Sequence, residues 1–482
     1  MHPLDHELLT QKDAFYWYCR MDMATTVAAK SNGIITEAQA REIAIGIQSL
    51  IEWGNENWDN RPTDYLDVQK KLLEITGPIA SRMHAGRSRQ DMLATLHRLH
   101  IRDRLLILLG ELLDIRKLIL EKGAEFQAIV VPTYTNGVQA QPVLFGHLMC
   151  GYESPQARNT ERFKEAILRL NQCPLGAAAL ATSRFNLDRE HIAHLLGFDT
   201  FVDNAFDAAQ LGIVDNGVEC AQISSLIALT LNMFVQDIHA QFHHASPWIL
   251  LTDGSLSSPS TLMPQKRNPV VLNRARLLGS EVVGASVTAA MAAHNVCSGL
   301  TDYKRMDAAH TLDLILKQFI EIKAILNGLK VDENAAMKEL EAEFTTTSEL
   351  AALLQEKSDI PLSISHAFAS QLVDLCRTKG FTLTTVPFDM VIDLFQDVLS
   401  QKNAHPVSDF PFSLEEFHQA IHPMTMVHNY KSVGGSSPKE VSRMMNSAFE
   451  RLNSDRKWLI SLKNTISERA QRLDMEFDAL LA

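Results

Sequence analysis

The feature that most limits the fold is a long stretch without proline in which apolar residues follow a helical period. Between Ala94 and Glu125, apolar side chains return every third or fourth position on one face, and a second apolar face lies beside it. The first face holds Leu105, Leu108, Leu109, Leu112, Ile115 and Ile119, and the second holds Leu106, Ile107 and Leu113. A helix that is apolar on two faces must be covered on both. Because segments 216–242 and 271–296 also lack proline, we expect three long helices in a bundle core that subunits could share.

The alternation typical of strands is scarce in the rest of the chain. Residues 129–134, which include Pro132, fit a short extended connection, and little else competes with helix. We therefore predict an all-α fold with three domains. These are an N-terminal helical domain at 1–88, a central helical bundle at 89–345 and a C-terminal helical domain at 346–482.

Charge and cysteine content narrow the class of protein. The 482 residues include 45 basic and 57 acidic side chains without a dense Lys/Arg tract, so neither nucleic acid nor membrane is expected as a partner. Six cysteines at unpaired spacings indicate reduced thiols rather than disulfides or a zinc site. The polar N-terminus does not resemble a signal peptide, and apolar runs such as 223–235 look too short or interrupted to span a bilayer. We expect a cytoplasmic protein.

The segment 258–269 is the strongest candidate for chemistry. Its prolines, Pro259, Pro264 and Pro269, predict a stiffened loop, and a scaffold-held loop is a common place for reactive groups. The serine at 260 could act as a base or nucleophile if Lys266 and backbone N–H groups stabilised its anion. By composition alone, an ordinary Ser/Pro surface turn is the more common explanation of such a segment.

Three other clusters carry candidate binding groups. Residues 84–91 offer guanidinium, hydroxyl and amide groups that could hold a carboxylate, although a solvated helix cap has the same composition. Residues 134–142 form a polar segment that could bind a substrate through hydrogen bonds, although an ordinary turn would have the same composition. The small side chains at 174–179 would permit close backbone approach. We find no phosphate-binding loop, metal-ligand spacing or nucleophile elbow, and we expect no cofactor and no metal.

Taken together and in order, these clusters resemble the fumarase/aspartase superfamily, and the argininosuccinate lyases most closely. The string Met263-Pro264-Gln265-Lys266-x-Asn268-Pro269 is highly specific to that superfamily. The other matching blocks are Asp22 with Thr25-Thr26, and residues 32–36, 84–91, 134–147, 173–176, 188–190, 204–208 and 434–438.

The resemblance implies a fold and a reaction. Superfamily members are homotetramers with one shared helical bundle, and each active site combines segments of three subunits. They remove a leaving group, often an amine, from a succinyl skeleton and in most cases give fumarate. By resemblance, Ser260 is the general base, while Lys266 and Asn268 stabilise the aci-carboxylate that develops. The residues expected to bind a small dicarboxylate or amino-acid substrate are Thr26, Ser88, Arg89, Gln90, Thr135, Asn136, Thr261, Met263 and Gln265.

Several departures from the argininosuccinate lyase pattern bear on the substrate. Asn136 stands where that family has its acid/base histidine, and Asn273 falls where it has the partner glutamate. Neither asparagine can donate a proton to a departing amine. Pro259 replaces a glycine, Gln90 replaces an asparagine, and Leu211-Gly212-Ile213 replaces an acidic-basic-acidic triplet.

These departures leave three functions open. The first is a lyase that eliminates a less cationic amine from an N-substituted aspartate, as an aspartase can work without that histidine. The second is argininosuccinate lyase itself. The third is a non-catalytic relative that keeps the tetramer for a structural or binding role, as lens crystallins of this lineage do.

Overall fold

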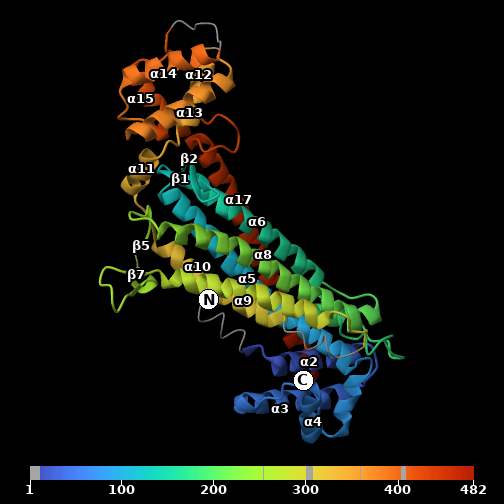
Figure 1. Cartoon of the computed structure of the whole chain (residues 1–482). Helices are drawn as coiled ribbons and strands as arrows, with labels where there is room; N and C mark the ends of the chain where they lie inside the picture. The colour runs from blue at the N-terminus through green and yellow to red at the C-terminus, as the bar shows by residue number, and fades with distance from the viewer. Residues whose placement is uncertain (1–10, 253, 300–307, 359, 403–408) are drawn as a thin grey trace.

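A computed structural model describes residues 11–252, 254–299, 308–358, 360–402 and 409–482. Long helices dominate and form an elongated bundle, with smaller groups of helices at its two ends (Figure 1). The bundle helices are α5 (Arg89–Glu125), α6 (Phe145–Leu170), α8 (Gly212–Gln241), α9 (Val270–Ala293), α10 (Ala308–Gly328) and α17 (Pro438–Leu481). The three long helices predicted from proline-free segments are confirmed as α5, α8 and α9, and the all-α class is confirmed with them.

The bundle holds the largest hydrophobic cluster of the described chain. Helix α5 runs through it with Leu105, Leu108, Leu109 and Leu112 fully buried. Since α5 packs against α6, α10 and α17, both of its apolar faces are covered, as the pattern requires.

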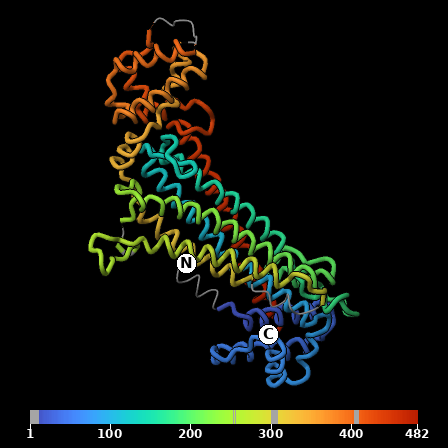
Figure 2. Tube along the Cα trace, in the orientation of Figure 1, coloured from blue at the N-terminus to red at the C-terminus, as the bar shows by residue number. Residues whose placement is uncertain are grey.

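A second cluster forms around the N-terminal helices. Its elements include α2 (Ala14–Ser31), α3 (Glu37–Glu56), α4 (Tyr65–Thr76), α7 (Arg189–Leu195) and the 3-10 segment η2 (Pro78–His84). A second 3-10 segment, η1 (Trp58–Asn60), follows α3. The far end of α17 joins this cluster through Leu473, Phe477 and Leu480. The tube in Figure 2 follows α17 from the C-terminal helices along the bundle to the N-terminal ones.

A third cluster is rich in phenylalanine and lies at the other end of the bundle. Its helices are α12 (Thr347–Ser358), α13 (Leu362–Lys379), α14 (Phe388–Gln401) and α15 (Leu414–Ala420), and α11 (Glu333–Ala342) and α16 (Pro423–Asn429) pack between it and the bundle. The domain boundaries at 88 and 345 stay a prediction.

Strands are few and paired in twos. Strands β1 (Val130–Thr135) and β2 (Val138–Leu144) form an antiparallel hairpin, so the expectation of a single extended connection at 129–134 was incomplete. Both tip residues, Asn136 and Gly137, have positive φ of 53° and 75°, which is the geometry of a tight type I′ turn. The other pairs are β3 (Gln172–Cys173) with β4 (Thr200–Phe201), β5 (Ile249–Leu251) with β8 (Leu329–Val331), and β6 (Ser258–Pro259) with β7 (Arg267–Asn268).

One segment of the described chain, Asp207–Gln241, is long and apolar enough to cross a membrane by length and composition. The expectation that the apolar runs are too short was therefore wrong for this segment. It comprises the π-helical turn η3 (Asp207–Leu211) and α8, which packs against α5, α6, α9 and α10. In its most apolar window 56% of the residues are buried, as in the core helix of a bundle.

Candidate active site

The proline-rich segment forms a loop that projects from the side of the bundle, just ahead of α9 (Figure 1). Strands β6 and β7 close its base, with Ser258 paired to Asn268 and Pro259 to Arg267. The side-chain amide of Asn268 also donates to the Ser258 backbone carbonyl at 3.3 Å. Residues 261–267 are exposed. The loop is therefore anchored at its base, while the side chains at its tip are exposed to solvent.

Within this loop, the hydroxyl oxygen of Ser260 is the acceptor for two backbone N–H groups. The amides of Leu262 and Met263 donate to Oγ at 3.3 and 3.1 Å. Donors aimed at an oxygen stabilise negative charge on it. The amide of Lys266 donates to the Met263 carbonyl at 3.0 Å, which keeps the lysine on the same tight turn. This arrangement suits an oxygen that must carry negative charge before it can act as a base.

The segment before α5 is fixed by a carboxylate. Ser88 is the N-cap of α5, and Asp91 completes a capping box with it. The other oxygen of Asp91 accepts from the amides of Gly176 and Ala178 at 2.8 and 2.9 Å. Burial raises the pKa of Asp91 to about 7, although these backbone donors and Arg87 act against the rise. Asp91 thus ties the start of α5 to the small-residue segment 174–179.

The predicted carboxylate-binding side chains at this helix start differ in exposure. Arg89 is exposed and forms an ion pair with Asp64. Gln90 is half-buried, and its backbone N–H donates to the Ser88 hydroxyl oxygen at 3.3 Å. Thr26 is buried in α2, where its hydroxyl donates to the Asp22 carbonyl at 2.7 Å.

A buried polar network lies next to Ser88, and no local pattern in the sequence predicts it. Arg87 donates to the Asp22 carboxylate at 2.6 Å and to the Tyr65 hydroxyl at 2.7 Å. Tyr65 in turn donates to Asp22 at 3.1 Å, and its oxygen lies 2.9 Å from Nε2 of His84. Burial, with the neighbouring Arg87 charge, lowers the pKa of His84 to about 3, so the imidazole is neutral at pH 7. The network holds the residue next to Ser88 in one position.

Thr135 and Asn136 lie at the exposed tip of the β1–β2 hairpin. The neighbouring Tyr134 is fixed by a hydrogen bond from its hydroxyl to Glu339 and by donation from the Trp248 indole at 3.2 Å. Asn273 is exposed in the first turn of α9.

A single chain does not bring these clusters together. Ser88 and the hairpin lie at opposite ends of α5, whose 37 residues span about 55 Å at about 1.5 Å per residue. The loop with Ser260 projects at a third place (Figure 1). One small substrate therefore cannot touch all three clusters of the same chain.

The described residues contain no group of three or more His, Cys, Asp or Glu side chains that could hold a metal ion. All six cysteines are free, and five of them are buried.

Comparison with known proteins indicates the class of protein to which this chain belongs. A family profile described as lyase matches residues 7–284. Argininosuccinate lyase of Methanosarcina acetivorans is 28% identical over 470 residues, which cover 96% of this chain and 91% of that relative. Argininosuccinate lyase of Geobacillus sp. strain WCH70 is 29% identical over 438 residues, with 87% and 89% covered.

Solved structures have the same fold. EDDS lyase in complex with formate superposes with a TM-score of 0.88 at 24% identity, covering 98% of this chain and 93% of that one. Class II fumarase of Schistosoma mansoni superposes with a TM-score of 0.66 at 16% identity, covering 88% and 93%.

The fold and the family match together define an enzyme of the fumarase/aspartase superfamily. More particularly, the chain belongs to the lyase family and is a carbon–nitrogen lyase of the argininosuccinate lyase type.

Proposed function

We propose that the protein eliminates an amine from an N-substituted aspartate and releases fumarate. The observation that carries the proposal is the pair of backbone N–H groups that donate to Oγ of Ser260 in a loop that also holds Lys266. The related argininosuccinate lyases and the EDDS lyase fold support the same type of reaction. We expect the enzyme to work in the cytoplasm without a cofactor.

In the proposed first step, deprotonated Ser260 takes a proton from the carbon beside the substrate carboxylate. The electron pair of that C–H bond moves into the carboxylate and forms the aci-carboxylate, which Lys266 and Asn268 stabilise. In the second step the pair forms the carbon–carbon double bond and the C–N bond breaks. The amine leaves with the electrons of the broken bond. Donors that bind the developing charge more strongly than the starting carboxylate lower the barrier.

The remaining substrate contacts are proposed to come from other subunits of a homotetramer. From those subunits, Ser88, Arg89 and Gln90 would bind one carboxylate, and Thr26 and Thr135 would add further contacts. Thr261, Met263 and Gln265 would come from the same loop as Ser260. The length of α5 supports this assignment because Ser88 and the β1–β2 hairpin lie at opposite ends of this helix, which is about 55 Å long.

The leaving amine is proposed to be less cationic than arginine. Asn136 and Asn273 carry no charge at any pH and cannot supply a proton, so the departing nitrogen must be protonated by another group or leave as a weaker base. Argininosuccinate remains the second candidate substrate because the most similar relatives reported above act on it by name. A non-catalytic role is the third possibility.

A panel of N-substituted aspartates, including argininosuccinate, tests the proposal by the absorbance of released fumarate. We expect turnover of at least one member, and a loss of about 10²- to 10⁴-fold in Ser260→Ala. Ser257→Ala, in the same part of the chain, is the matched control and should keep its rate. If no member reacts, and no amine adds to fumarate in the reverse direction, the non-catalytic role holds.

A further inference from the structure

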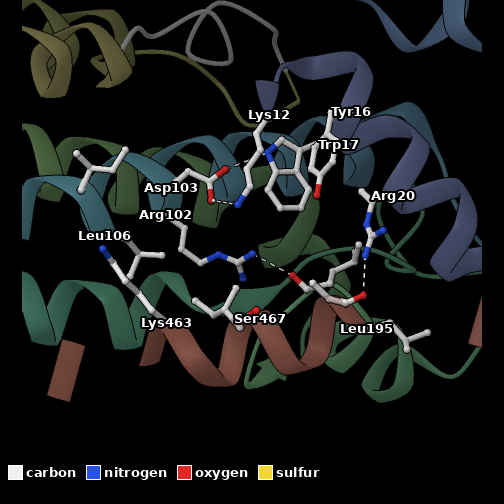
Figure 3. Close-up of a pocket in the computed structure, with 14 residues that line it drawn as sticks. Lys12, Tyr16, Trp17, Arg20, Arg102, Asp103, Leu106, Leu195, Lys463 and Ser467 are labelled. Atoms are coloured by element: carbon white, nitrogen blue, oxygen red, sulfur yellow. Dashed lines mark hydrogen bonds and ion pairs between the residues drawn. The ribbon is translucent and has the colours of Figure 1, made fainter. Parts of the chain in front are cut away.

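A cavity of about 360 Å³ lies where α2, α5, α7 and α17 meet. Small-molecule sites commonly have roughly 300–1,000 Å³. Its lining includes none of the candidate active-site residues. Figure 3 shows Arg102 between Asp103 and Trp17 on one side and the α17 side chains Lys463 and Ser467 on the other. The cavity is therefore a separate place at which a ligand could bind.

Much of the cavity wall is apolar and aromatic. The lining side chains of this kind are Tyr16, Trp17, Leu106, Ile107, Leu195, Leu196 and Ile466. Such a wall favours a ligand with a flat or apolar body over a fully hydrated ion.

Two of the lining cations are neutralised within the protein. Lys12 lies 3.9 Å from the Asp103 carboxylate, which also accepts from the Trp17 indole at 3.1 Å. Arg20 forms an ion pair with Asp474 on α17. Figure 3 draws the contacts of Lys12 and Trp17 with Asp103.

The other two lining cations, Arg102 and Lys463, have no carboxylate within hydrogen-bonding distance among the described residues. Arg102 is only 1% exposed and donates to the Asn171 side-chain oxygen at 3.2 Å and to the Leu196 carbonyl at 3.0 Å. Both acceptors are neutral.

The Nε–H group of Arg102 is buried and has no hydrogen-bond partner in the described part of the chain. A guanidinium is charged at all ordinary pH values. Burying it without a nearby acid is unfavourable unless another group supplies negative charge, and Asp103 is already shared with Lys12 and Trp17. Arg102 therefore brings to the cavity wall a positive charge that no acid within hydrogen-bonding distance offsets.

We infer that this cavity binds an aromatic carboxylate, with the ring against Trp17 and the neighbouring aliphatic side chains and the carboxylate toward Arg102 and Lys463. The anion matches the two cations that lack an acid, and the ring matches the apolar wall. The inference does not depend on the proposed reaction, because the site shares no residue with it.

Isothermal titration calorimetry with benzoate tests the inference on the full chain. Benzoate is expected to bind, whereas benzamide and inorganic phosphate, which lack the charge or the ring, are not. Lys463→Ala should weaken benzoate binding about fivefold, in the range measured for single exposed charges. Lys457→Ala, an exposed lysine on the same helix outside the cavity, is the matched control.

Two further variants locate the binding. Arg102→Met, checked for folding by circular dichroism, should abolish benzoate binding. Arg89→Ala should leave it unchanged, because Arg89 belongs to the candidate active site. Equal binding of benzamide, unaltered affinity in Lys463→Ala, or loss of affinity in Arg89→Ala would each overturn the inference. If Arg102→Met does not fold, the Lys463→Ala and Arg89→Ala results decide.

Discussion

The guanidinium of Arg87 lies 2.6 Å from the carboxylate of Asp22, and neither side chain has any exposed surface. This ion pair joins α2 to the residue that precedes the N-cap of α5. It therefore connects the N-terminal helices to the first candidate substrate-binding segment.

Breaking that pair should be costly because it leaves a buried charge without its partner. We expect Asp22→Asn to lower the free energy of unfolding by about 3–5 kcal/mol, measured by urea denaturation. Asp474→Asn removes the acid of the half-exposed pair with Arg20 and should cost below about 1 kcal/mol. Equal effects of the two substitutions would contradict the importance of burial.

Asp91 should make stability fall as the pH rises. Burial raises its pKa from 3.8 to about 7, so the folded protein binds this proton more tightly than the unfolded chain. The stability it contributes is complete below about pH 4 and is lost as the pH approaches 7. Between pH 5 and pH 7 the wild type should lose about 2 kcal/mol relative to Asp91→Asn. Parallel pH profiles of the two proteins in urea would refute this prediction.

His84 should act with the opposite sign. Burial lowers its pKa from 6.5 to about 3, so the unfolded chain binds the proton more tightly. The stability that neutral His84 contributes is complete above pH 6.5 and is lost as the pH falls toward 3. Relative to His84→Gln, the wild type should lose about 2 kcal/mol between pH 6.5 and pH 5. The exposed His428→Gln is the control, and its profile should follow the wild type.

The hairpin tip should require glycine. Gly137 has a φ of 75°, where a side chain clashes with the following carbonyl, so Gly137→Ala should cost about 1–2 kcal/mol. Gly151 lies in α6 with open space around it, and Gly151→Ala should instead stabilise by roughly 0.5–1 kcal/mol. Thermal unfolding of both variants measures the difference in sign.

The two asparagines should determine which amine leaves. If Asn136 and Asn273 exclude argininosuccinate, the double variant Asn136→His with Asn273→Glu should raise its turnover at least about tenfold, since a positioned acid/base pair becomes available. The single variants should gain less. A wild type that already prefers argininosuccinate over the other N-substituted aspartates would refute this account.

The long helices were predictable because their apolar period is regular over many turns, as in α5. The β1–β2 hairpin was only partly predicted. Asn136-Gly137 is a strong turn signal, but Pro132 and Pro142 argue against strands on both sides of it. Arg87 contacts Tyr65, which lies 22 positions away in the sequence, and Asp22, which lies 65 positions away. No local sequence pattern predicts partners at such separations. The proposed meeting of Ser260 and Ser88 across subunits of a tetramer leaves no local pattern in the sequence of one chain.

Helix α17 supplies Leu473, Phe477 and Leu480 to the hydrophobic cluster built by the first helices of the chain. During synthesis these side chains are made long after the first helices that they cover. The first helices must therefore wait, incompletely packed, until α17 has been made, and a chain cut short before Leu473 would lack the side chains that cover them.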